Sequence, residues 1–282
     1  MRRRSARTLL ADPGARAGLL ILALLAGAAL LAPLVAPGDP AALGPSAARL
    51  LPPGPGRPLG TDPLGRDVLS RLLHGARASL LVGVVGAAIA VGLGTLVGLA
   101  AGLGRTAADR LLMGLADVGL AFPRLILALF LVSLAAPSLG LVIAVLALTG
   151  WMGVARLVRA ETLSLRERDF VLAARGLGLA PARLALRHVL PHLLPTVAVA
   201  VALRVGNAIL LESFLSYLGL GAQEPTVSWG AMIEQGRAHL LDGWWLTAFP
   251  GLALTLAVVG CNLLGDGLSE ALDPRGEGRV LP

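Results

Sequence analysis

Six apolar stretches, each long enough to cross a lipid bilayer as a helix, decide what this chain can fold into. A helical crossing takes roughly 20 residues, and the stretches cover residues 17–36, 79–103, 119–135, 139–158, 193–220 and 245–268. Hydrophobic residues make up 56% of the 282 residues and charged residues only 15%, whereas soluble domains have roughly a quarter charged residues. We therefore predict an all-α membrane protein with six transmembrane helices.

The first apolar stretch also has an alternative interpretation. It follows a basic start, which is typical of a cleaved signal peptide. The stretch is longer than the apolar part of such peptides, and no clear small-residue cleavage site ends it. We interpret it as an uncleaved membrane anchor.

The basic, sulfur-containing and aromatic residues exclude several kinds of chemistry. All 24 basic residues are arginine, so the chain has no lysine for a phosphate-binding loop or a Schiff base. The single cysteine, Cys261, excludes an internal disulfide and a multi-thiolate metal site. Aromatic residues make up 4% of the chain, too few for a surface that stacks nucleic-acid bases. We expect no cofactor, no metal and no ATP hydrolysis by this chain itself.

The distribution of arginine predicts the orientation in the membrane, because segments on the cytoplasmic side are enriched in positive charge. With the N-terminus in the cytoplasm, the inner segments hold Arg2, Arg3, Arg4, Arg7, Arg16, Arg105, Arg110, Arg124, Arg156, Arg159, Arg166, Arg168, Arg175, Arg183, Arg187, Arg275 and Arg279. The outer segments hold Arg49, Arg57, Arg66, Arg71, Arg77 and Arg237. Both termini are therefore predicted to be cytoplasmic.

Three regions follow from this order of segments. Residues 1–77 are predicted to form an N-terminal anchor and an extracytoplasmic segment rich in Pro and Gly, residues 78–272 a five-helix core, and residues 273–282 a cytoplasmic tail. In the second apolar stretch, glycines recur every four residues, which predicts a helix face that a neighbouring helix can approach closely. They are Gly94, Gly98 and Gly102.

The inner loop of residues 159–192 is predicted to form two short helices that are broken by glycine. Gly176 and Gly178 can adopt the positive φ angles that end a helix, and Pro181 suits the first turn of the second helix. Pro191 and a further proline at 195 are predicted to separate that helix from the fifth span. An amphipathic hairpin of this kind docks a soluble partner or anchors the bundle at the membrane surface, and the physical pattern alone leaves both alternatives open.

The same loop resembles a known family. Leu172-Ala173-Ala174, followed by Gly178 and by Leu190-Pro191, resembles the EAA loop of binding-protein-dependent ABC importer permeases, although Leu172 stands where the family pattern has Glu. Three further stretches resemble the shorter permease subunit of dipeptide, oligopeptide and nickel importers, and with the first helix the resemblance covers nearly the whole chain. They are Leu59–Leu80, Leu215–Arg237 and Trp244–Arg275.

The resemblance implies a type I ABC importer permease fold in a bacterial or archaeal cell membrane. It implies that this subunit pairs with a second, homologous permease subunit, that two ATPase subunits bind inside, and that an extracytoplasmic binding protein delivers the solute. The loop would couple to an ATPase through Phe170, Ala173, Ala174, Arg175, Gly178 and Pro191. The implied function is ATP-driven import of dipeptides or oligopeptides. Import of nickel or another small solute, a proton-coupled secondary transporter and an intramembrane enzyme are alternatives.

Five polar residues lie within the apolar stretches or at their ends: Arg204, Asn207, Glu212, Asn262 and Asp266. Because charge in hydrocarbon is costly, they are expected to face the bundle interior or water. Either they line a wet solute path, or they pair with each other and fix the helix packing. The proton-coupled alternative would use Glu212 or Asp266 to carry protons.

Two smaller groups of residues have weaker signals. The outer segment alternates in charge through Asp62, Arg66, Asp67 and Arg71, which predicts a solvated turn and short helix or a contact for the binding protein. His188 and His192 are four residues apart, but Pro191 lies between them and no third ligand is evident. We interpret the histidines as a structural pair.

Overall fold

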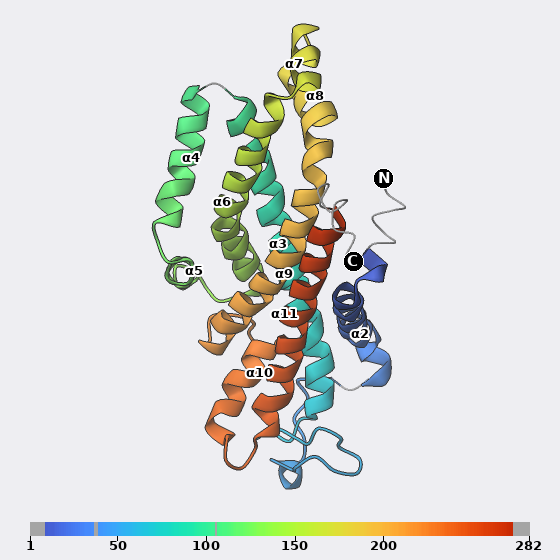
Figure 1. Ribbon diagram of the computed structural model, residues 1–282. Helices are drawn as coiled ribbons and strands as arrows, with labels where there is room; N and C mark the ends of the chain where they lie inside the picture. The colour runs from blue at the N-terminus through green and yellow to red at the C-terminus, as the bar shows by residue number, and fades with distance from the viewer. Residues whose placement is uncertain (1–8, 37–38, 105, 273–282) are drawn as a thin grey trace.

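The computed structural model describes residues 9–36, 39–104 and 106–272, which fold into a bundle of helices (Figure 1). Five long helices form its body: α2 (Pro13–Val35), α3 (Val68–Leu103), α6 (Leu139–Arg166), α9 (Leu190–Tyr217) and α11 (Trp245–Leu272). The shorter helices are α4 (Thr106–Leu120), α5 (Arg124–Ser133), α7 (Asp169–Gly176), α8 (Pro181–Leu184) and α10 (Trp229–Gly236). Short 3₁₀ turns form at Ser46–Ala48 and Arg237–His239.

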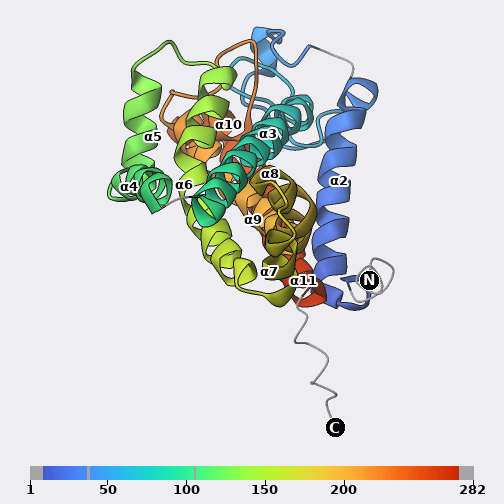
Figure 2. The ribbon, with the colours of Figure 1, turned by 90° about the horizontal axis from the view of Figure 1, so that it is seen from above.

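The long helices place the connecting segments at two opposite ends of the molecule. Helices α7 and α8 form one end, which we call the hairpin end, and α10 with residues 39–67 forms the other, which we call the loop end (Figure 1). Seen from above, α2 lies at one edge and α4 with α5 at the opposite edge, with α3 and α9 between them (Figure 2).

Five of the six predicted spans correspond to one long helix each. Helices α2, α3, α6 and α11, and the helical run that ends with α9, are long and apolar enough to cross a bilayer. Helix α3 begins at Val68, well before the predicted start at residue 79. The predicted boundary between residues 77 and 78 therefore falls inside a continuous helix.

The third predicted span, residues 119–135, is wrong as a single helix. Its residues are divided between the end of α4 and all of α5, and these two helices are bent by 87° at the break between them. Pro123 lies in the break, where it caps the start of α5. Proline lacks an amide hydrogen and disfavours helical angles in the residue before it, so a straight helix cannot continue through this position.

Two ion pairs hold α4 against α6. Asp109 and Asp117 of α4 accept hydrogen bonds from Arg159 and Arg156 of α6, respectively. Residues 106–118 lie between two predicted spans, and they form most of an amphipathic helix whose carboxylates are neutralised by the neighbouring helix.

The predicted close packing of the glycine-rich face of α3 is confirmed, and its partner is α6. A Cβ atom added at Gly94, Gly98 or Gly102 would lie 2.6 Å from an atom of α6. At Gly98 the nearest atom is the carbonyl oxygen of Ala155. The two backbones therefore approach more closely than any residue with a side chain would permit.

The helix that leads into the fifth span differs from the prediction. Helix α8, a π-helical turn at Ala185–Val189 and α9 form one helical run from Pro181 to Tyr217. Pro191 lies in the first turn of α9, where its missing amide hydrogen breaks no α-helical bond. The π turn shifts the hydrogen-bond register just before the proline, so the chain stays helical there.

Some predictions concern residues outside the described ranges. They are the tail of residues 273–282 and the arginines Arg2, Arg3, Arg4, Arg7, Arg105, Arg275 and Arg279. The cytoplasmic placement of both termini stays a prediction.

A pair of glycine substitutions on α3 tests the contact with α6. Gly98→Ala puts a methyl group 2.6 Å from a backbone oxygen, so we expect a loss of about 1–3 kcal/mol in stability, as overpacking usually causes. Gly92→Ala on the same helix meets nothing within 4 Å and gains helix propensity. Thermal unfolding of the detergent-solubilised protein should show a lower midpoint for Gly98→Ala alone. Equal midpoints would contradict the close contact.

Candidate functional site

The hairpin is fixed to the bundle by its inward face. Val171 and Ala174 of α7 are 0% and 6% exposed. They belong to an apolar cluster that also contains Leu184 of α8, Leu193 of α9 and Leu165 of α6. A displacement of α7 is therefore transmitted to the ends of both α6 and α9.

The outward face of the hairpin is apolar although it lies beyond the body of the bundle (Figure 1). Leu177 is 82% exposed, Leu186 62% and Leu172 48%. Exposed arginines flank them at Arg175 and Arg183. Exposed leucines grouped at one tip are typical of a surface that a partner covers.

A glycine turn closes α7 and reverses the chain. Gly178 has φ of +77°. Its amide donates to the carbonyl of Arg175, and the amide of Leu179 donates to the carbonyl of Ala174. This is the Schellman pattern, which favours glycine because other residues are strained at positive φ. The predicted role of Gly178 in the turn is confirmed.

The structure divides the six predicted coupling residues into two groups. Phe170, Ala173, Arg175, Gly178 and Pro191 are exposed at the hairpin end. Ala174 is buried in the protein's own core, so the expectation that it contacts a partner needs correction: it positions α7. Leu177, the most exposed leucine of the tip, is absent from the predicted set, although its place beside Gly178 in the turn was a usable signal.

The histidine pair near the hairpin is structural in its contacts. Nδ1 of His192 lies 2.7 Å from the carbonyl oxygen of His188. The ring of His192 stacks on Phe170 with the centroids 4.8 Å apart. Among the described residues no group of three or more potential ligands could hold a metal ion.

At the loop end, the charged outer residues form a buried ion-pair network. Asp62 accepts a hydrogen bond of 2.6 Å from Nε of Arg66, and its Oδ2 lies 3.6 Å from Nε of Arg71. Arg66 also donates to Glu224 at 2.8 Å, and Arg71 donates to Gln235 at 2.9 Å. Burial opposes the ionisation of Glu224, but the hydrogen bond from Arg66 and the two arginine charges hold the pKa of this carboxyl below its usual value.

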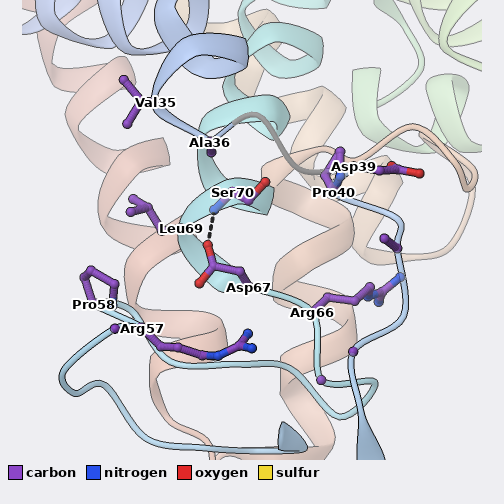
Figure 3. Close-up of a pocket in the computed structure, with 14 residues that line it drawn as sticks. Val35, Ala36, Asp39, Pro40, Arg57, Pro58, Arg66, Asp67, Leu69 and Ser70 are labelled. Carbon is purple, nitrogen blue, oxygen red and sulfur yellow. Dashed lines mark hydrogen bonds between the residues drawn. The ribbon is translucent and has the colours of Figure 1, made fainter.

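The prediction of a solvated turn is therefore wrong for these residues. Asp62, Arg66 and Arg71 are only 3%, 5% and 1% exposed. Asp67 caps the start of α3 by accepting a hydrogen bond from the amide of Ser70 (Figure 3). The sequence could not reveal the partner Glu224, because it lies more than 150 residues further along the chain.

A cavity of about 380 Å³ opens beside this network (Figure 3). It lies between the end of α2, the first turn of α3 and the loop that carries Arg57 and Pro58. Arg66 and Asp67 line it together with Asp39.

The polar residues of the long helices occupy different environments. Glu212 of α9 is 0% exposed and accepts hydrogen bonds from the hydroxyl groups of Ser79, Ser213 and Ser216. Ser79 also accepts a hydrogen bond from the amide of Trp229, so the carboxylate joins α3, α9 and α10. These contacts favour a packing role for Glu212.

The other four polar residues do not pair with each other. Asn262 and Asp266 are exposed on α11, and their side chains form no hydrogen bond with another described residue. Asn207 is exposed on α9 and donates to the carbonyl of Leu203 at 2.9 Å. Arg204 is half-buried and lies against α6 at Gly153.

Family models cover most of the chain. The model described as binding-protein-dependent transport system inner membrane component matches residues 94–277. The model described as N-terminal TM domain of oligopeptide transport permease C matches residues 1–53.

Individual proteins are also similar over nearly their whole length. A putative peptide transport system permease protein of Brucella abortus is 41% identical over 271 residues, which cover 96% of this chain and 91% of the relative. The di/tripeptide transport system permease protein DppC of Pseudomonas aeruginosa is 41% identical over 276 residues, with 94% and 89% covered. The inward-facing MetNI methionine ABC transporter has a similar fold, with a TM-score of 0.58 and 18% identity over 72% of this chain and 96% of that one.

Removing the shared carboxylate of the outer network should destabilise the protein. Asp62→Asn leaves two buried guanidinium groups with one half-exposed carboxylate, and breaking a buried ion pair typically costs about 3–5 kcal/mol. We expect a clearly lower midpoint of thermal unfolding. Asp242→Asn is the matched control, because that side chain is 62% exposed. Similar midpoints for the two variants would contradict the role of the network.

Two glycines of the hairpin, separated by one residue, test its turn. Neither Gly178 nor Gly176 has an atom within 4 Å of an added Cβ, but only Gly178 has positive φ. Gly178→Ala should therefore cost about 1–2 kcal/mol through backbone strain alone, while Gly176→Ala should be neutral or stabilising. Hydrogen exchange at the amides of residues 177–179 should be faster only in Gly178→Ala. Unchanged exchange would show that the turn does not need glycine.

Proposed function

This chain belongs to the family of binding-protein-dependent transport system inner membrane components, and we propose that it forms half of the translocation pathway of an ATP-driven importer of dipeptides or oligopeptides. The cargo is inferred from the names of the relatives, which are peptide, dipeptide and oligopeptide permeases. The protein is an inner-membrane transport component rather than an enzyme. Its family implies ATPase and binding-protein partners.

The observation that carries the proposal is the exposed apolar tip of the hairpin. Leu172, Leu177 and Leu186 are exposed at one end of the bundle, and Val171 and Ala174 fix the same hairpin to α6 and α9. A surface of this kind suits the cleft of an ATPase subunit. The chain has no lysine for a phosphate-binding loop, so it receives mechanical work at this tip instead of binding the nucleotide itself.

The fold supports a route for that work. Helix α6 runs directly into the hairpin, and the helical run from Pro181 to Tyr217 leaves it. When the ATPase subunits close, a rigid hairpin moves with them and tilts both helices, which switches access from one side of the membrane to the other.

The remaining partners follow from this arrangement. A second, homologous permease subunit completes the pathway as a heterodimer, and two ATPase subunits bind at the hairpin end. The binding protein docks at the loop end, near the cavity beside Arg66 and Asp67. Both termini and the hairpin are then cytoplasmic.

The alternatives differ in what drives uptake or in the cargo. A proton-coupled transporter would use Glu212 or Asp266. Glu212, however, is 0% exposed and accepts hydrogen bonds from serine hydroxyl groups, so it has no contact with water. An importer of nickel would have the same architecture, and the binding protein would select the metal. The uptake assay below separates these alternatives from peptide import.

Matched leucine substitutions test the docking tip. Leu177→Glu places a charge on a side chain that is 82% exposed, and Leu241→Glu makes the same change at a leucine that is 101% exposed at the loop end. We expect Leu177→Glu to reduce co-purification of the ATPase subunits and ATP-driven uptake of a labelled dipeptide at least about tenfold, a loss of ~1.4 kcal/mol in coupling. Leu241→Glu should leave ATPase co-purification unchanged.

Two outcomes would contradict the proposal. Full uptake and normal ATPase binding by Leu177→Glu would exclude coupling at the tip. Peptide uptake by this chain alone in liposomes, without ATPase subunits, would exclude the ATP-driven mechanism.

A further inference from the structure

Two arginines from different helices converge on the middle of α6. Arg124 is the first residue of α5, directly after the bend at Pro123. A Cβ atom added at Gly150 would lie 3.5 Å from Nη2 of Arg124, and one added at Gly153 would lie 2.8 Å from Nη2 of Arg204. Because residues three apart share a helix face, both guanidinium groups lie against one side of α6, where their positive charges repel each other.

This placement differs from the sequence prediction for Arg124. The distribution of arginine predicts an inner segment for Arg124, although this residue lies near the start of the predicted third span. The bend instead turns α5 away from the direction of α4 at the edge of the bundle (Figure 2), and Arg124 packs against α6 well away from the ends of that helix. In the sequence, a basic residue beside a proline within an apolar stretch could have indicated this position.

No acidic group in the described part of the chain neutralises this pair. The helices α4, α5, α6 and α9 carry only four acidic residues. Asp109 and Asp117 form ion pairs with Arg159 and Arg156 of α6. Glu212 is buried and accepts hydrogen bonds from serine hydroxyl groups. Glu161 lies eight residues after Gly153 on α6, and Glu212 lies eight residues after Arg204 on α9. Each separation is about 12 Å along the helix.

The site is therefore a concentrated positive charge that residues 9–36, 39–104 and 106–272 leave unbalanced. Nε of Arg124 is buried and has no hydrogen-bond partner among the described residues. Arginine cannot lose its charge by releasing a proton at any physiological pH, and a charge among apolar helices is energetically unfavourable. An anion that binds both guanidinium groups would remove this cost.

From this geometry we propose that Arg124 and Arg204 form a binding site for the C-terminal carboxylate of a cargo peptide as it passes through the membrane. The inference rests on the proposed function, in which the cargo is a peptide. Planar guanidinium groups bind a carboxylate through paired, charge-assisted hydrogen bonds. Every unmodified peptide carries this group whatever its side chains, so one site can serve many sequences.

Asn207 supports the assignment. It lies three residues after Arg204, on the same face of α9, and it is exposed. Its amide nitrogen donates to Leu203, which leaves the side-chain oxygen as an acceptor. A peptide that places its carboxylate on the arginines has backbone N–H groups for such an acceptor.

The charge of the site can be measured by the rate at which charged reagents modify a cysteine placed at position 207. Asn207→Cys is introduced together with Cys261→Ala into the complete complex in liposomes, and the thiol is modified with anionic and cationic methanethiosulfonate reagents. We expect the anionic reagent to react about tenfold faster, because a positive site concentrates anions. Arg124→Gln or Arg204→Gln should abolish this preference. Asn262→Cys, on the exposed face of α11, is the matched control. Neither arginine substitution should change the ratio of anionic to cationic modification rates at this cysteine.

Protection by peptide then tests the ligand. A dipeptide with a free carboxylate, delivered by the binding protein, should slow modification of Asn207→Cys at least about fivefold, which corresponds to a ligand at several times its Kd. The same dipeptide as its C-terminal amide, added to equal saturation of the binding protein, should not protect. Arg124→Lys and Arg204→Lys keep the charge but lose the paired hydrogen bonds, so they should retain the preference for the anionic reagent and lose the protection.

Each other outcome overturns the proposal. Equal protection by acid and amide would exclude carboxylate recognition, and an unchanged reagent preference in Arg204→Gln would exclude a positive site. Loss of the second permease subunit from the purified Arg→Gln complexes would assign the arginines to a carboxylate of that subunit. Failure of the proposed function is distinguishable, because the unmodified complex would then show no ATP-driven peptide uptake.

Discussion

The backbone contact between α3 and α6 sets the position of α6 within the bundle. Gly94, Gly98 and Gly102 bring the two helices together over three turns, and α6 is thereby held in a fixed position in the bundle. Helix α6 then supplies the arginines that bind α4, and its end continues into the hairpin. Both the hairpin and the two arginines at Gly150 and Gly153 are therefore positioned by this one helix.

The protein deals with buried charge in three different ways. At the loop end, Asp62 and Glu224 neutralise two arginines and join segments that are far apart in the sequence. Glu212 has hydroxyl groups as its partners and links three helices. Arg124 and Arg204 have neither kind of partner in the described chain. Buried charges that are paired stabilise one structure, whereas a charge without a partner is available to a ligand.

The sequence predicted what depends on local pattern and missed what depends on distant contacts. Apolar length identified five spans, glycine spacing identified the packing face of α3, and Gly178 identified the turn of the hairpin. The third span is not a single helix, because the chain bends by 87° at the break that contains Pro123. The burial of Asp62 and the position of Arg124 depend on contacts with residues of distant segments, which no local window contains.

One continuous helical run connects the hairpin with Arg204. From Pro181 at the hairpin to Arg204 it spans 24 residues, about 35 Å at the α-helical rise of 1.5 Å per residue. In the proposed mechanism this run tilts with the hairpin, and such a tilt also displaces Arg204 relative to Gly153 of α6. Arg124 belongs to α5, which is not part of that run. Closure of the ATPase subunits would therefore change the separation of the two guanidinium groups, so that the same motion that switches access would bind or release the carboxylate.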